Sequence, residues 1–195
     1  MTMRLLTSAA LALGALFNSA CAPVVVGGAM ATTATVAHDR RTTGSVVEDT
    51  AITRRVNSGL HADEELQENS HVNVSVFNGW VLLSGEAPTE AFRARAGDIA
   101  RAQDKVRRVF NEITIAAPSS AMTRSSDAWI TTKVKSSLLG VKIDGYDPTR
   151  VKVVTENGTV FLLGLVYHKE ADATVAKTQE VAGVQRVVKL FEYLD

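Results

Sequence analysis

Few residues of this chain have the side chains and spacing that catalysis requires. The four histidines, His38, His61, His71 and His168, lie far apart in the sequence, and none stands at a spacing typical of metal ligands. Cys21 is the single cysteine, which excludes an intramolecular disulfide and a zinc site with two thiolates. Neither a G-x-S-x-G motif nor a P-loop occurs. We therefore expect no enzyme activity, no catalytic residue, no metal site and no cofactor.

Two acidic groups could be imagined in acid–base or cation chemistry, but their positions argue against it. Glu64 and Glu65 are adjacent, so on a regular element they point in different directions, and a solvated loop is the expected setting. Asp144 and Asp147 could join Asn157 around a cation, but Asn157 belongs to a predicted hairpin turn. Neither group is predicted to be a site.

A more specific pattern lies on the helix predicted at about 128–139. Trp129 and Lys133 are four residues apart and therefore share a face. That face is about 100° from the apolar stripe that begins at Ile130, so the indole is not needed for the core. Tryptophan is favoured at membrane interfaces, and each lysine near an anionic surface is worth about 1 kcal/mol. If this face meets a membrane, the phospholipid-binding residues would be Trp129, Lys133, Lys135, Leu139, Val141 and Lys142.

The residue pattern leaves other roles open for Trp129. Its indole could lie in the seam between two domains rather than on a lipid surface. It could also be an interface hot spot if the chain is a protein-interaction adaptor.

The first 20 residues read as a signal peptide. Arg4 precedes an uncharged apolar run, Leu5 to Phe17, which is too short to span a bilayer. The small residues Ser19 and Ala20 then precede Cys21. This arrangement favours cleavage before Cys21 and covalent lipid attachment to it, and a plain secretory signal is the alternative. A lipid would hold the mature chain on a membrane rather than across it.

The rest of the chain contains one small module twice. Residues Asp49, Ile52, Val56, Leu60, Asn78-Gly79 and Gly85 recur as Asp127, Ile130, Val134, Leu138, Asn157-Gly158 and Gly164. A repeat of this length indicates two tandem copies of a domain. We assign a tether to residues 21–45, the first domain to 46–116, a linker to 117–126 and the second domain to 127–195.

Each copy predicts the element order helix, strand, strand, helix, strand. The first helix carries a stripe at i, i+4 and i+8, with Asp49 and the segment 125–127 as expected N-caps. Asn-Gly predicts a type I′ hairpin turn, and Gly85 with Pro88 is expected to end the following strand. The last strands are predicted at 106–115 and 185–193. The fold class is α+β, with a three-stranded mixed sheet against two helices in each domain.

Composition limits the partners. The 195 residues include 21 basic and 21 acidic side chains, so there is no electrostatic case for nucleic acid. A domain of roughly 65 to 70 residues is near the lower limit for a self-sufficient core. We therefore expect the two copies to lean on each other or on another partner.

The element order, the Ala-rich second helix and a Gly-Val-x-x-Val before the last strand resemble the BON domain. The second copy carries this motif at 183–187, whereas the first has Lys105 in place of the Gly. Four segments, 55–58, 109–113, 129–134 and 153–165, are more specifically similar to the two-BON lipoproteins of the Gram-negative outer membrane. These are the division- and outer-membrane-stress-associated lipid-binding proteins, and the resemblance covers Cys21 to the C-terminus.

The resemblance implies binding of anionic phospholipid through the first helix of the second domain. It also implies a location on the inner leaflet of the outer membrane, facing the periplasm, with enrichment at the division site and a role in envelope integrity. Ala22, rather than Asp, follows Cys21, which resembles outer-membrane sorting. Outer-membrane assembly or division proteins are the further partners that we expect. The alternative function is a protein-interaction adaptor that docks on outer-membrane assembly or envelope-remodelling machinery.

Overall fold

The structure is a computed structural model, and it describes residues 39–195. The predicted signal peptide, the lipidation site Cys21 and the tether up to residue 38 lie outside the described residues. Within residues 39–195, no helix combines the length and the apolar character needed to cross a membrane.

The first domain has two helices, a short extra helix and a mixed sheet. Its elements are α3 (Thr43–Ala62), α4 (Glu64–Asn69), β1 (His71–Phe77), β2 (Trp80–Ala87), α5 (Glu90–Arg101), β3 (Arg108–Asn111) and β4 (Thr114–Ile115). β1 pairs with β2 antiparallel, and β3 and β4 pair with β2 in parallel. The predicted last strand is thus split in two. The expected loop at Glu64 and Glu65 is instead the first turn of α4.

The second domain repeats this arrangement with an unbroken last strand. Its elements are α6 (Ala121–Leu138), the 3₁₀ turn η1 (Pro148–Arg150), β5 (Val151–Glu156), β6 (Thr159–Val166), α7 (His168–Gln179) and β7 (Arg186–Tyr193). The sheet order is β5-β6-β7, antiparallel and then parallel. The predicted α+β fold of two tandem mixed-sheet domains is confirmed.

Both first helices begin earlier than predicted. Ser120 caps α6 by accepting a hydrogen bond from the Thr123 N–H, and Thr42 caps α3 in the same way. The predicted linker 117–126 is therefore helical from residue 121, and the predicted tether is helical from residue 43. The predicted caps at Asp49 and at 125–127 are wrong, because Asp49 and Asp127 lie inside their helices and are buried.

The two buried aspartates hold the hairpin turns of their own domains. Asp127 accepts hydrogen bonds from the N–H groups of Asn157 and Gly158, at 2.8 and 2.9 Å. Asp49 does the same for the first hairpin, with two bonds of 2.7 Å. Both turn residues have positive φ in each copy, as a type I′ turn requires. An aspartate in a helix and an Asn-Gly pair thus recur together because they bind each other.

We had predicted that Gly85 ends its strand, and this is wrong. It lies inside β2 with a φ of 112°, and a Cβ there would come within 1.9 Å of the His71 carbonyl oxygen. Only glycine permits β1 to approach so closely. Lys105, which replaces the family glycine, also has a positive φ of 64°.

The central strands β2 and β6 are buried on both faces. Val81 and Leu83 face the helices of the first domain, whereas Leu82 between them joins a cluster shared by both domains. This shared cluster, which we call the seam, consists of Phe77, Leu82, Phe161, Leu163 and Leu190. Burial on both faces explains why these strands are continuously apolar instead of alternating.

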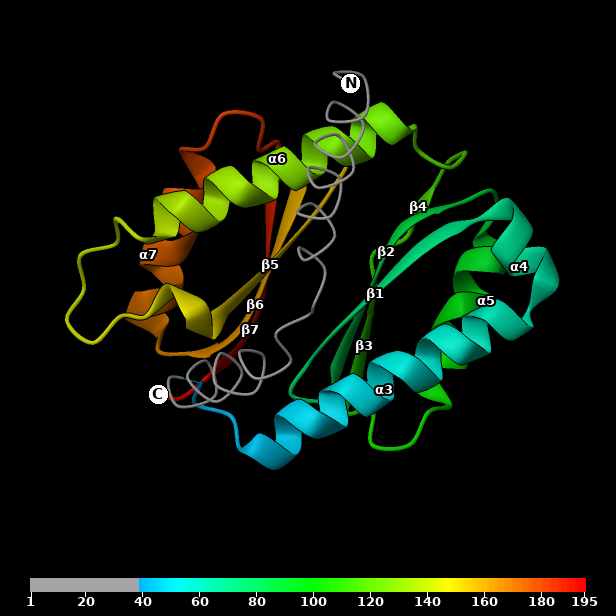
Figure 1. Ribbon diagram of the computed structural model, residues 1–195, viewed down its shortest axis with the longest axis horizontal. Coiled ribbons are helices and arrows are strands. Elements are labelled where there is room, and N and C mark those ends of the chain that lie inside the picture. Colours follow the sequence, from blue (N-terminus) through cyan, green and yellow to red (C-terminus); the bar gives the residue numbers. More distant parts are fainter. Residues whose placement is uncertain (1–38) are drawn as a thin grey trace, which may run out of the picture. The chain divides into compact units, whose positions relative to one another are not determined.

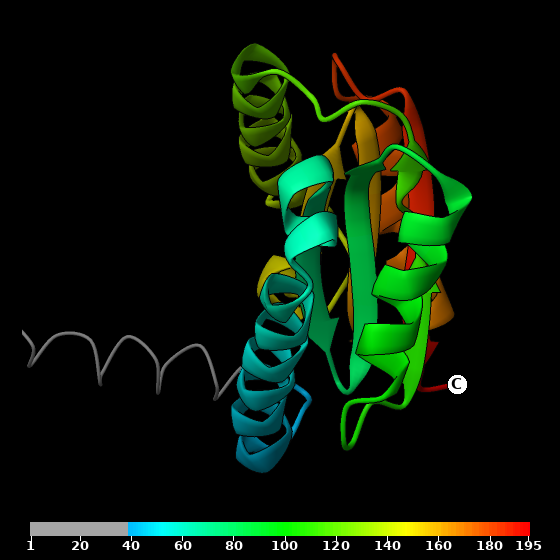
Figure 2. The same ribbon diagram turned by 90° about the vertical axis from the view of Figure 1, so that its right-hand side faces the viewer.

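The two sheets therefore face each other, and the helices lie on their outer faces (Figure 1). Figure 2 looks onto the helices of the first domain, with α3 and α5 in front of its strands. The two domains therefore pack against each other, and each covers apolar surface of the other.

The chain segment before α3 contacts both domains. Arg40 donates to both carboxylate oxygens of Glu170 on α7, at 2.6 and 2.9 Å. Arg41 donates to Asp49 at 2.6 Å, and its guanidinium lies 3.9 Å from the ring centre of Phe77. The last residues of the predicted flexible tether are thus fixed to the folded part of the chain.

Candidate functional site

The helix α6 has a buried side and an exposed side. Its buried residues are Asp127, Ile130, Val134 and Leu138, spaced three or four apart. Trp129 lies on the exposed side, with 63% of its surface accessible. The indole is therefore not part of the seam, which the sheets form on the opposite face of the domain. An indole that is so exposed to water does not gain the free energy of burying its apolar surface unless a partner covers it.

Two further large apolar side chains are exposed on this helix. Met122 is 83% accessible and stands seven residues before Trp129, within about 20° of it around the helix axis. Leu139, the C-cap residue, is 75% accessible and lies about 80° further round. We had not predicted Met122, because the helix was expected to begin after it. The seven-residue spacing to Trp129 was the available signal.

The predicted lysines do not form one group. The Lys133 ammonium donates a hydrogen bond to the carbonyl oxygen of Ala182, so it is tied to its own domain. Lys135 lies on the side of α6 that faces η1 and β5. Lys142 and Val141 lie beyond the helix and line a hollow of about 410 Å³ with α7. The structure therefore gathers Lys135 with Leu139, and separates Val141 and Lys142 from both.

Lys135 stands where two hollows meet. One, of about 420 Å³, is mostly apolar and is lined by Lys135, Ser136, Leu139, Pro148, Thr149 and Val151. The other, of about 350 Å³, lies between the domains and contains the cationic groups of Arg41, Lys135 and Lys152 with one carboxylate, Asp49. An apolar hollow beside a cationic one matches the division of a phospholipid into acyl chain and phosphate.

Lys152 adds to the positive character of the second hollow. Its ammonium donates to the Val76 carbonyl at 3.2 Å, across the domain boundary. The pKa of Lys152 is lowered, first by enclosure of the ammonium between the domains and then by the positive charge of Arg41. Part of the side chain remains accessible to solvent. A bound anion would relieve the repulsion among these cations.

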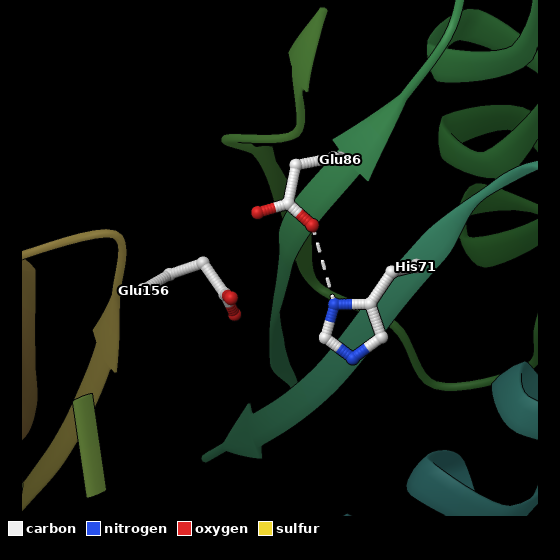
Figure 3. Close-up of side chains that lie close together, drawn as sticks. All are labelled: His71, Glu86 and Glu156. Carbon is white, nitrogen blue, oxygen red and sulfur yellow. Dashed lines mark hydrogen bonds and ion pairs between the residues drawn. The ribbon is translucent and has the colours of Figure 1, made fainter. Parts of the chain in front are cut away.

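A second polar cluster lies between the two sheets. His71 on β1 and Glu86 on β2 come from the first domain, and Glu156 at the end of β5 comes from the second (Figure 3). Burial raises the pKa of the Glu156 carboxyl, although a hydrogen bond from Asn73 at 2.8 Å partly offsets this. We had expected no metal site at any histidine, because none of the four histidines stands at a metal-ligand spacing, and these three residues are far apart in sequence. No spacing rule could have found them.

Comparison with known proteins identifies the family. The BON domain profile matches residues 48–117 and 126–195. The chain belongs to the BON-domain family. It is 38% identical over 197 residues to the outer membrane lipoprotein DolP of Haemophilus influenzae, with both chains covered in full. The tandem pair of domains and this full-length identity make it a dual-BON protein of the DolP type.

Two other proteins are similar to this BON-domain chain. A 21 kDa hemolysin of Actinobacillus pleuropneumoniae is 38% identical over 156 residues, which cover 80% of this chain and 79% of the hemolysin. A solved structure of CdsD, a structural protein of the type III secretion system of Chlamydia trachomatis, is 13% identical and has a TM-score of 0.30. The match covers 72% of this chain and 91% of the CdsD chain. A structural similarity with so low a TM-score supports no inference about this chain.

Proposed function

We propose that this protein is a lipid-anchored outer-membrane protein, facing the periplasm, that binds anionic phospholipid through α6. The observation that carries this proposal is the indole of Trp129, which is 63% exposed. It lies on a helix that packs against its own domain through other residues. The full-length identity to an outer membrane lipoprotein supports the location, with Cys21 as the lipidated residue.

The charge of α6 suits an anionic surface. Its basic residues are Arg124, Lys133 and Lys135, and its single acidic residue, Asp127, is buried against the hairpin. The exposed side therefore presents apolar and basic groups with no carboxylate. In this proposal Met122 and Trp129 enter the interfacial region of the bilayer, while Lys135 reaches the phosphate groups.

The proposal extends to cell physiology through the same contact. Binding to anionic phospholipid would concentrate the protein where such lipids gather, which is how it would support envelope integrity at the division site. In this proposal an assembly or division protein is the further partner recruited there. No catalytic step is part of this function, and the lipid on Cys21 is the one covalent group that it needs.

Vesicle co-sedimentation tests the proposal. A chain lacking residues 1–21 keeps every described helix and strand, and it should co-sediment with anionic vesicles more than with neutral ones. Trp129→Glu should abolish this binding and leave the melting temperature within about 2 °C, because the residue is exposed. Val47→Glu is the matched control, since Val47 is a 65% exposed apolar residue on α3. It should bind as the wild type does.

The opposite result has a clear meaning. If neither kind of vesicle retains the wild-type chain, or if Trp129→Glu binds unchanged, the lipid assignment of α6 is wrong. The adaptor function would then be favoured, with Trp129 as a protein-binding hot spot.

A further inference from the structure

We propose that His71, Glu86 and Glu156 form a site for a divalent transition-metal ion that ties the two domains together. This function is separate from phospholipid binding, and Zn²⁺ is the probe with which we would test it. The cluster lies between the sheets, away from the exposed side of α6.

The geometry brings three donors to one point. One ligand atom from each residue lies within 4.8 Å of the other two, and the three groups are directed into a common space (Figure 3). The His71 Nδ1 and the Glu86 Oε2 are 3.3 Å apart. Two ligands on a tetrahedral zinc with bonds of about 2.0–2.1 Å are separated by about 3.3 Å. One edge of the coordination sphere is therefore already formed, and a small movement of Glu156 completes the third position.

The charge of the cluster calls for a cation. Glu86 is 1% exposed and Glu156 is 8% exposed, so two carboxylates are buried together. His71 pairs with Glu86 as a charged group only when its imidazole is protonated. The other hydrogen-bond donors to the two carboxylates are neutral: the amides of Asn73 and Asn157, the Ser84 hydroxyl and the Ser119 N–H. Between residues 39 and 195, no lysine or arginine forms an ion pair with either carboxylate. Buried charge is costly unless it is paired, and a dication would balance both groups.

The donor set selects the type of ion. One imidazole nitrogen with two carboxylate oxygens suits zinc and its neighbours, whereas Mg²⁺ and Ca²⁺ prefer oxygen ligands alone. The His71 side chain is 28% exposed, which gives an entry path and room for water as a fourth ligand. The amides of Asn73 and Asn157 hold the two carboxylates in place, as residues that hydrogen-bond to the metal ligands do in known metal sites.

The position of the site predicts its effect. Two ligands come from the first domain and one from the second, so an ion can bind all three only when the domains are together. An ion that binds only the folded pair raises its stability. We expect Zn²⁺ at about 100 times its dissociation constant to raise the melting temperature by about 5–10 °C. Mg²⁺ at the same concentration should have no effect.

The test uses a tag-free chain lacking residues 1–21, with thermal melting and calorimetric titration of Zn²⁺. The wild type should bind one ion, and EDTA should reverse the rise in melting temperature. His71→Ala should weaken zinc binding by at least about 10-fold. Mutating a residue that only hydrogen-bonds to a metal ligand typically lowers metal affinity about 10–100-fold, and the loss of a ligand itself should matter no less. His61→Ala is the control, because His61 is exposed on α3 and bonds to the Asn57 carbonyl. It should keep the full zinc response.

Glu156→Gln gives a second test, because its melting temperature should compare differently with that of the wild type in EDTA and in zinc. In EDTA this variant should melt no lower than the wild type, because it removes one of two buried negative charges and still accepts from Asn73. In zinc it should melt lower, because it has lost a ligand. The proposal is overturned if Zn²⁺ does not stabilise the wild type, if His71→Ala responds equally, or if Mg²⁺ acts as Zn²⁺ does.

Discussion

The first helices of the two domains, α3 and α6, have the same buried side. Asp49, Ile52, Val56 and Leu60 on α3 correspond to Asp127, Ile130, Val134 and Leu138 on α6. In each copy the aspartate binds its own hairpin and the three apolar residues join its own core. What both copies share is therefore what one domain needs in order to fold.

The exposed sides of the two helices differ. Where α6 has Met122, Trp129 and Leu139, α3 has Gly44, Ala51 and His61. Glu48 on α3 has Ser126 as its counterpart, and Glu48 is paired with Lys105 at 2.6 Å. The exposed side of α6 thus gained apolar surface and has no carboxylate. The comparison teaches that the duplicated module kept its interior, whereas the exposed sides of its two copies differ in apolar surface and in charge, as the proposed lipid binding requires.

The shared aspartates should carry the largest stability effect. Asp127→Ala removes two hydrogen bonds from a buried carboxylate and leaves two hairpin N–H groups unpaired, so the free energy of unfolding should fall by about 3 kcal/mol. Asp49→Ala should cost at least as much, because it also loses Arg41. Urea denaturation measures both. Asp144→Ala, in an exposed loop, should change stability by less than about 0.5 kcal/mol. A loss below about 1 kcal/mol in either domain would contradict the shared role.

The ion pair of Arg40 with Glu170 should have the next largest effect. Arg40→Ala leaves a buried carboxylate with fewer partners and should cost about 2 kcal/mol at pH 7. Arg54→Ala, an exposed arginine on α3, should cost little. Equal melting temperatures for the two variants would show that the segment before α3 is not held to the second domain.

This effect should depend on pH in a stated direction. Burial alone would raise the pKa of Glu170, but hydrogen bonds from Arg40 and from the Tyr167 N–H outweigh it and lower the pKa. A lowered pKa in the folded state stabilises the protein above the unfolded value of about 4.3. The stabilisation is lost as the pH falls through the folded pKa. The difference between wild type and Arg40→Ala should therefore be constant from pH 5 to 8 and shrink below about pH 4.

The lysines near α6 should have the smallest effects, and they concern binding. Lys135→Ala should weaken the affinity for anionic vesicles about 5-fold, the equivalent of about 1 kcal/mol. Lys133→Ala should weaken it less, because that ammonium is held by Ala182. Both losses should fade at high salt. Lys105→Ala in the first domain is the control. If it weakens binding as much as Lys135→Ala, the attraction is a property of total charge and not of the second domain.

Much of the fold could be predicted from local patterns. The type I′ turns followed from Asn-Gly, and the buried stripes of α3 and α6 followed from helical spacing. The helix starts could not, because Asp49 and Asp127 have the side chain of an N-cap but bind a hairpin 30 residues away. A long-range partner had replaced the local one.

The seam and the metal cluster show two different limits. The continuous apolar runs 81–83 and 160–163 are typical of strands buried on both faces, so the sequence does contain a signal for the seam. His71, Glu86 and Glu156 meet only because two domains pack sheet to sheet, and that placement has no local signal. For the α6 surface, the sequence indicated Trp129, but the separate settings of Lys133, Lys135 and Lys142 required the structure.

Tryptophan fluorescence tests the central claim, that the exposed side of the second copy alone binds lipid. The chain has two tryptophans, Trp80 and Trp129, so Trp80→Phe leaves the α6 indole as the only reporter. Its emission should shift to the blue on addition of anionic vesicles and be quenched by brominated lipid. The matching Trp129→Phe chain, which reports from Trp80, should show no shift. An unchanged spectrum for Trp129, or an equal shift for Trp80, would contradict the account.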